Sequence, residues 1–205
     1  MDGDLLIGII ERVGIFVFGL SGGLAAVRHR MDIVGTVIVA LLPAVGGGTL
    51  RDLLLDLPVF WLDDNPSILL AAAGGLAAFF APGYFTRLKS LVWLDAVGLA
   101  LFAVVGADKA MDLNHGFLVT VMMGAMTAAA GGLIRDVVCN ETPLLLREEI
   151  YFTAACVGAS VYWAARTMGL GEMECLMAGA AAGLALRAAG IVFRLSLPKP
   201  RAGGE

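Results

Sequence analysis

Two glycine-rich stretches that end in Arg-Asp decide the fold of this chain: Gly46-Gly47-Gly48-Thr49-Leu50-Arg51-Asp52 and Ala130-Gly131-Gly132-Leu133-Ile134-Arg135-Asp136. The second stretch follows the first at a distance of 84 residues. When this offset is held without gaps from residue 11 to residue 56, 12 of 46 positions are identical. Similarity at a fixed distance indicates two structural units of the same kind.

The composition of the chain predicts that both units lie in a membrane. Hydrophobic residues make up 59% of the 205 residues, another 27 residues are glycine, and only 16% are charged. Soluble domains contain roughly 45–50% apolar and about 25% charged residues, and disordered chains combine low hydrophobicity with high charge. The composition therefore excludes both classes, and the net charge of −4 offers no basic surface for nucleic acid.

Apolar runs separated by short polar segments predict seven transmembrane helices in an all-α polytopic membrane protein. A helix needs about 20 residues to cross the bilayer. The runs cover residues 5–27, 32–55, 66–80, 88–110, 116–138, 150–166 and 173–193. Because each repeated unit holds three helices, an odd number, we expect the second unit to lie upside down relative to the first. The expected organisation is a three-helix repeat at 1–86, an inverted three-helix repeat at 87–170, a seventh helix at 171–195 and a polar cytoplasmic tail at 196–205.

Lysine and arginine residues set the expected orientation in the plasma (inner) membrane. Four of them lie on the side that holds the N-terminus and the loops after the second, fourth and sixth helices, and ten lie on the other side. Since cytoplasmic loops carry the excess of these residues, we expect the N-terminus outside and the C-terminus in the cytoplasm. The acidic N-terminus lacks the basic region of a cleavable signal peptide, so the first helix is expected to be retained.

The glycine clusters and Pro43 predict interruptions in the second and fifth helices. Glycine permits non-helical backbone, and proline lacks an N–H and kinks a helix. Lipid cannot satisfy the freed backbone groups, and paired interruptions in inverted repeats indicate a transport path. The residues expected at these breaks and in the pore are Pro43, Gly46, Gly47, Gly48, Thr49, Gly131 and Gly132. The alternative role of such glycines is close helix packing.

Ionisable residues inside membrane helices are candidates for function and require partners. We expect Glu11 to pair with Arg51 toward the outer face and, at the same offset, Asp95 to pair with Arg135 toward the inner face. The charges expected at the pore mouths are Glu11, Arg51, Asp52, Asp95, Arg135 and Asp136. In the alternative interpretation, both arginines extend to the lipid headgroups. Lys109 is a candidate for voltage-dependent gating, or extends to the headgroups in the same way.

No pattern in the sequence predicts an enzyme, a cofactor or a metal site. The three cysteines form no CxxC pair, and His29 and His115 lack the spacing of an HExxH metal motif. No GxSxG elbow is present, and Ser21-Gly22-Gly23 is interpreted as a helix-packing segment.

The first glycine-rich stretch with the residues after it, and the end of the second copy, resemble the prokaryotic branch of the trimeric intracellular cation (TRIC) channel family. The segments that carry the resemblance are Gly46 through Leu55, Pro58-Val59-Phe60-Trp61 and Glu141-Thr142-Pro143-Leu144. The resemblance extends from about Leu5 to Phe193. It implies seven helices in two inverted repeats plus a seventh, and a homotrimer in membrane lipid. It also implies one water-filled pore per protomer, associated with the kinked second and fifth helices, for monovalent cations (K⁺, Na⁺), chiefly potassium.

Two points of the resemblance leave alternatives open. Animal members of the family carry Lys-Glu-Val on the fourth helix, where this chain has Asp108-Lys109-Ala110, so only Lys109 matches and lipid regulation is not carried over. Some relatives of this branch are described as transporters of small solutes such as glycine. Broken helices serve a transporter as well as a channel, so the sequence predicts a potassium-permeable channel and keeps a secondary transporter as the alternative.

Overall fold

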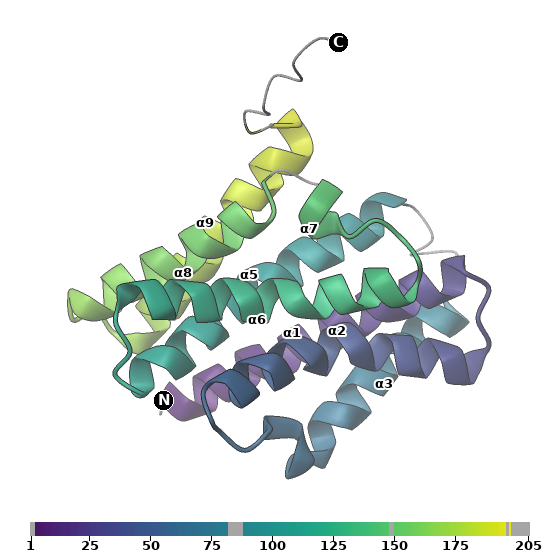
Figure 1. Ribbon diagram of the computed structural model, residues 1–205, viewed down its shortest axis with the longest axis horizontal. Coiled ribbons are helices and arrows are strands. Elements are labelled where there is room, and N and C mark those ends of the chain that lie inside the picture. Colours follow the sequence, from purple (N-terminus) through teal and green to yellow (C-terminus); the bar gives the residue numbers. More distant parts are fainter. Residues whose placement is uncertain (1–2, 82–87, 148–149, 196, 198–205) are drawn as a thin grey trace, which may run out of the picture.

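The computed structural model describes residues 3–81, 88–147, 150–195 and 197, and the secondary structure within these ranges is helical. The long helices are α1 (Gly3–Arg28), α2 (Ile33–Leu54), α3 (Asn65–Phe80), α5 (Leu88–Asp112), α6 (Phe117–Val138), α8 (Phe152–Thr167) and α9 (Glu172–Phe193) (Figure 1). Two short elements, the 3-10 turn η1 (Phe60–Leu62) and the helix α7 (Leu144–Arg147), lie in the connections. Each long helix begins and ends within two residues of an apolar run predicted from the sequence. The expected boundary between the repeats, at residues 86 and 87, and the expected tail at 196–205, apart from residue 197, lie outside the described residues.

Five of the described helices are long and apolar enough to cross a membrane, namely α1, α2, α5, α6 and α9. The helices α3 and α8 each have 16 residues. A helix of this length measures about 24 Å, which is less than the roughly 30 Å of a hydrocarbon core. Length and hydropathy therefore assign five membrane-spanning helices directly.

The bounds of the helices follow the offset found in the sequence. The helix α2 runs from residue 33 to 54 and α6 from 117 to 138, so both of their ends lie 84 residues apart. The offset also relates the first residue of η1, Phe60, to the first residue of α7, Leu144. The third helix of each half departs from it, because α3 begins at residue 65 and α8 at 152. Thus the similarity in sequence corresponds to similar local structure.

The helices α2 and α6 cross at their glycines and run in opposite directions (Figure 1). A Cβ atom on Gly47 would overlap the backbone carbonyl of Thr127, and one on Gly131 would overlap the backbone carbonyl of Pro43. Residues 47 and 131 are related by the 84-residue offset, as are 43 and 127. Each half therefore contributes the same pair of positions to the crossing.

The expected interruption of α2 and α6 is not found. Both helices are continuous through their glycine clusters, and α2 also continues through Pro43. Glycine at a close crossing removes the side chain that would keep two backbones apart. An unbroken helix also keeps its backbone hydrogen bonds, which lipid cannot replace. The prediction of broken helices was therefore wrong for this structure, and close packing accounts for the glycines at the crossing.

A second reciprocal contact joins α1 to α5. The ring of Phe102 packs on Gly14 and the ring of Phe18 packs on Gly98. The two rings stack on each other with centroids 5.2 Å apart and planes 7° from parallel. All four residues are related by the same offset. This stack lies in the core that α1, α2, α5 and α6 share.

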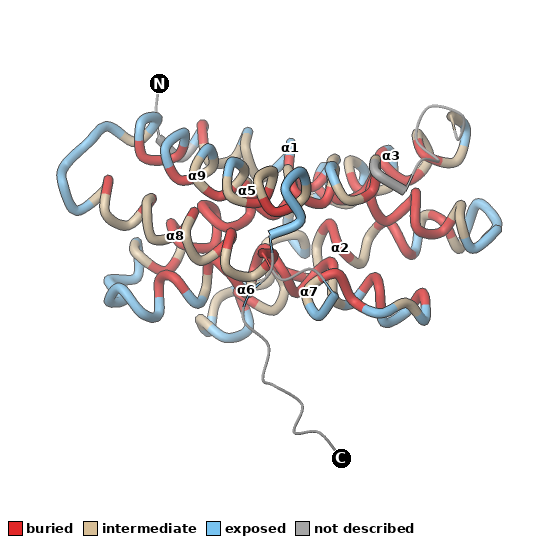
Figure 2. The backbone as a smooth tube through the Cα atoms, turned by 90° about the horizontal axis from the view of Figure 1, so that it is seen from above, coloured by how far each residue is buried: buried red, intermediate tan, exposed pale blue. Residues whose placement is uncertain are grey.

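The remaining helices pack on the outside of this core. The helix α3 packs against α1 and α2, α8 packs against α5 and α6, and α9 packs against α5 and α8. Buried residues follow the inward sides of the helices, whereas the connections are mostly exposed (Figure 2). The packing of α9 on α5 and α8 places it mainly against the second half of the chain.

Candidate functional site

The first candidate cluster, which we name the Arg51 cluster, consists of Glu11, Arg51 and Asp52. The Arg51 side chain is 0% exposed, although it lies near the end of α2. Its Nε donates a hydrogen bond to Asp52 Oδ1 over 2.7 Å. Its Nη1 lies 3.6 Å from Glu11 Oε1 on α1, which is an ion-pair distance rather than that of a hydrogen bond. The Arg51 guanidinium also lies over the ring of Phe60, 5.7 Å from its centroid.

The second candidate cluster, which we name the Arg135 cluster, consists of Asp95, Arg135 and Asp136. Arg135 donates from Nε to Asp136 Oδ1 over 2.8 Å and from Nη1 to Asp95 Oδ1 over 2.9 Å. Its Nη1 also donates to the hydroxyl of Ser21 on α1 over 2.6 Å. The side chains of Arg135 and Asp95 are both 0% exposed. Neither arginine extends to the surface, because each is held by a carboxylate from its own half.

The aspartate of each Arg-Asp pair also holds the connection that follows its helix. Asp52 Oδ2 accepts a hydrogen bond from the backbone N–H of Phe60 over 2.9 Å. Asp136 Oδ2 accepts one from the backbone N–H of Leu144, also over 2.9 Å. Carboxylate oxygens satisfy N–H groups that begin a helical turn, so these aspartates position η1 and α7. The sequence analysis did not predict this role, and the one signal for it is that eight residues separate Asp52 from Phe60 and Asp136 from Leu144.

We expect the Asp52→Ala substitution to weaken the attachment of η1 to α2, which increases local opening at Phe60. The backbone N–H of Phe60 loses its charged acceptor, and a hydrogen bond to a charged group contributes about 1.5–3 kcal/mol. Hydrogen–deuterium exchange at the Phe60 amide should accelerate at least about tenfold, the factor that 1.4 kcal/mol produces. The exchange of Leu144, which depends on Asp136, serves as the internal control and should not change. Unchanged exchange at Phe60 would show that other contacts hold η1.

The predicted pore residues gather at the crossing and beside the two clusters. At the crossing, the Cβ position of Gly46 lies 3.2 Å from Ile134 Cδ1 and 3.8 Å from Gly131 Cα. Gly48 packs under the ring of Phe60, where a Cβ would lie 2.6 Å from a ring carbon. The Cβ position of Gly132 lies 3.0 Å from the Tyr151 hydroxyl and 3.2 Å from Asp95 Oδ1. The glycines therefore make room for the groups that cover each cluster.

The Thr49 hydroxyl forms hydrogen bonds with Val45 in α2 and with Trp61 in η1. It donates to the Val45 carbonyl over 2.7 Å and accepts from Trp61 Nε1 over 2.8 Å. The indole thus covers the Arg51 end of α2. The position that matches Thr49 is Leu133, so the second half has no equivalent polar contact at this point.

Lys109 lies on α5, half-buried and within electrostatic reach of Glu11. Its neighbour Asp108 is buried, accepts a hydrogen bond from the Tyr162 hydroxyl, and lies 3.8 Å from Arg166 Nη1. The position that matches Asp108 in the first half is Leu24. This network ties α5 to α8, and the sequence did not predict it because its members do not repeat.

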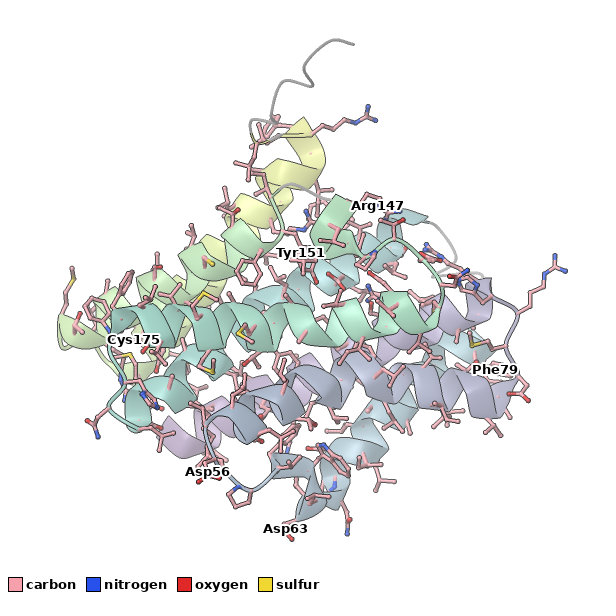
Figure 3. The ribbon with its side chains drawn as sticks, in the orientation of Figure 1. Asp56, Asp63, Phe79, Arg147, Tyr151 and Cys175 are labelled. Carbon is pink, nitrogen blue, oxygen red and sulfur yellow. The ribbon has the colours of Figure 1, made fainter. Side chains whose placement is uncertain are left out.

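Two further buried side chains connect α9 to the Arg135 cluster. Tyr151 lies before the start of α8 (Figure 3) and is 1% exposed. Its hydroxyl and an oxygen of Asp95 both lie within 3.2 Å of the Cβ position of Gly132. Arg187 of α9 lies over the Tyr151 ring, 5.1 Å from its centroid, and donates to the Ile150 carbonyl over 3.3 Å. Neither residue has a counterpart that the repeat reveals, so no pattern in the sequence pointed to them. Among the described residues, no group of three or more histidines, cysteines and acidic residues has the geometry of a metal site.

Comparison with known proteins identifies the family of this chain. A family model described as "Glycine transporter" matches residues 8–82 and again residues 92–167, so one model fits both halves. The UPF0126 inner membrane protein YadS of Escherichia coli K12 is 39% identical over 198 residues, which cover 95% of this chain and 96% of the relative. Relatives of this kind, together with the apolar helices, show that the chain is an integral membrane protein.

Solved structures agree with this assignment. The TRIC trimeric intracellular cation channel orthologue from Rhodobacter sphaeroides superposes with a TM-score of 0.88 at 41% identity, covering 93% of this chain and 99% of that chain. A prokaryotic TRIC channel determined in 0.5 M KCl superposes with a TM-score of 0.86 at 27% identity, covering 94% and 99%. The similarity extends over nearly the whole of each chain. The chain therefore belongs to the prokaryotic branch of the TRIC channel family, as the two Gly-rich/Arg-Asp stretches predicted.

Proposed function

We propose that this protein is a channel for monovalent cations, chiefly potassium, with one pore in each protomer of a homotrimer. One observation carries the proposal. Two buried arginine–carboxylate clusters, related by the repeat, lie on opposite sides of the point where α2 and α6 cross at Gly47 and Gly131. Charged groups inside membrane helices are expensive and mark ion pathways. The solved relatives described as cation channels support this assignment.

The proposed architecture is an inverted repeat. We assign residues 1–86 and 87–170 to two oppositely oriented three-helix units, residues 171–195 to a seventh membrane helix and 196–205 to a cytoplasmic tail. The reciprocal contacts at the glycine crossing and at the Phe18–Phe102 stack support this division. The excess of lysine and arginine favours a cytoplasmic location for the Arg135 end and an external N-terminus.

Conduction in this proposal requires α2 and α6 to move apart. At present their backbones touch through Gly47 and Gly131. Once the helices separate, the crossing offers an ion the carbonyls of Pro43 and Thr127, because the residues that face them, Gly131 and Gly47, have no side chain. Each helical carbonyl keeps a second lone pair, and carbonyl oxygens replace the hydration shell of potassium in selective pores. The charges expected at the two mouths are those of the Arg51 and Arg135 clusters, with Lys109 as the candidate for gating.

The test is single-channel recording of the purified protein in a planar bilayer with a potassium chloride gradient. We expect unitary currents that reverse near the potassium equilibrium potential, and a particle mass in detergent that matches three copies. Saturable glycine uptake without unitary currents would contradict the proposal and favour the transporter that the family description names. Currents that reverse near the chloride potential would also contradict it.

A further inference from the structure

The two arginine clusters differ in one position that breaks the repeat. Arg135 Nη1 donates to Ser21, and the residue that matches Ser21 at the 84-residue offset is Val105. Both side chains are buried, at 0% and 1% exposure. A valine offers no acceptor, so Arg51 cannot form the bond that Arg135 forms. The sequence interpretation of Ser21 as a packing residue was therefore incomplete.

The consequence is visible in the hydrogen bonds of the Arg51 cluster. Within the described part of the chain, Arg51 Nη1 and Nη2 and Glu11 Oε1 are buried without a hydrogen-bond partner. Buried groups of this kind are costly when unsatisfied, and in native proteins ordered water usually satisfies them. The Nη1 atom of Arg51 is therefore left without the partner that Ser21 gives to Arg135. Within the same part of the chain, the Arg135 cluster also holds two buried polar atoms without a hydrogen-bond partner, Arg135 Nη2 and Asp95 Oδ2. Unlike Arg51, however, Arg135 donates from Nη1 to both Ser21 and Asp95.

The Ser21–Arg135 hydrogen bond joins the two halves of the chain, whereas the bonds of Arg135 to Asp95 and Asp136 do not. Asp95, Arg135 and Asp136 all belong to the second half of the chain, whereas Ser21 belongs to the first half. A further side-chain contact between the halves, His29 Nε2 to Glu141 Oε1 over 2.8 Å, lies at this same end. Among the described residues, the side-chain hydrogen bonds and ion pairs near the Arg51 cluster stay within one half. Within the described part of the chain, the side-chain hydrogen bonds that join the two halves therefore lie at the Arg135 end.

We propose that the path between the halves is closed at the Arg135 cluster, and that Ser21 is the positioning residue that holds it closed. The inference rests on the proposed function, because it locates the closed point of that path. Separation of α2 and α6 moves Arg135 with its own carboxylates but away from Ser21. The Ser21–Arg135 bond is therefore the buried hydrogen bond that opening must break, whereas Arg51 and Glu11 remain together.

The test uses a matched pair of substitutions, Ser21→Ala and Val105→Thr. The first removes the hydroxyl at the Arg135 end with little change in volume. The second adds a hydroxyl at the matching position, and threonine has nearly the shape of valine. In single-channel recordings we expect Ser21→Ala to raise the ratio of open to closed time about tenfold, as the loss of a hydrogen bond to a charged group implies. We expect Val105→Thr to leave this ratio unchanged or lower it.

A second readout does not depend on ion currents. Cys139 follows α6, its side chain is buried, and its backbone N–H donates to the Arg135 carbonyl over 2.9 Å. Burial raises the pKa of the Cys139 thiol, so the thiol reacts slowly while the cluster is closed. In a background with Cys156→Ala and Cys175→Ala, Ser21→Ala should accelerate maleimide labelling of Cys139 about tenfold, the same factor as for the open ratio. Val105→Thr should not accelerate it.

The outcomes separate the two proposals. An unchanged labelling rate in Ser21→Ala overturns the inference, as does equal acceleration by Val105→Thr, which would indicate general loosening. An unchanged open ratio in a protein that conducts overturns it as well. If the unsubstituted protein passes no unitary current, the channel proposal fails. Cys139 labelling then decides by itself whether Ser21 closes the Arg135 end.

Discussion

The Arg135→Gln substitution should strongly destabilise this protein. Arg135 compensates two carboxylates, Asp95 and Asp136, whose side chains are 0% and 6% exposed. Removing one partner of a buried ion pair typically costs about 3–5 kcal/mol, because a charge is left without compensation in a medium of low dielectric constant. Denaturant titration of the protein in detergent micelles measures the free energy of unfolding.

Arg12→Gln is the matched control for this substitution. Arg12 pairs with Asp64 at 3.8 Å, and its side chain is 51% exposed. Exposed pairs contribute about 0–1 kcal/mol, so the control should lose little. The double substitution Arg135→Gln/Asp95→Asn should recover part of the loss, since it removes one of the uncompensated charges. Equal losses for Arg135→Gln and Arg12→Gln would show that the Arg135 cluster does not stabilise the fold.

The second large effect is expected from Gly47→Ala and Gly131→Ala. Each new methyl group meets a backbone carbonyl, that of Thr127 or of Pro43, which has no rotamer by which to yield. Overpacking of this kind costs about 1–3 kcal/mol, occasionally more. Denaturant titration of each purified variant gives the free energy of unfolding. The two losses should be similar, because the repeat places both glycines in the same reciprocal contact.

Gly8→Ala is the control for the crossing. Gly8 also lies inside a helix, α1, but a Cβ there would have no neighbour within 4 Å among the described atoms. Alanine in a helix is favoured over glycine by about 0.5–1 kcal/mol, so this variant should match or exceed the parent in stability. If Gly47→Ala behaves like Gly8→Ala, α2 and α6 do not cross as closely as the structure indicates.

The helices could be predicted from the sequence because each is a long apolar run with a polar boundary. The run 32–55 became α2, which begins at the Asp32 cap, where Oδ1 accepts from the Gly35 N–H over 2.7 Å. The Arg-Asp pairs could be predicted because they recur at a fixed distance. Their proximity to Glu11 and Asp95 followed from the cost of leaving a membrane charge without a partner.

The sequence could not predict whether α2 and α6 are broken or continuous, because glycine clusters occur both at helix breaks and at close helix crossings. The same Gly46-Gly47-Gly48 run suits a broken helix and a close helix crossing, and only the position of Thr127 on another helix distinguishes them. Ser21 and Tyr151 were missed for a related reason. Their partners, Arg135 and Asp95, lie 114 and 56 residues away in the chain, and no repeat points to these contacts.

By itself, the sequence determined that this protein lies in a membrane, that its helices occupy predictable ranges, and that its two halves are related. These properties depend on composition and on local and repeated patterns in the chain, which do not depend on its tertiary contacts. Only the tertiary structure decided that α2 and α6 stay unbroken and that Ser21 reaches Arg135. These properties depend on which buried groups come into contact. The fold decides whether a buried polar group finds a hydrogen-bond partner, and a group without one destabilises the protein.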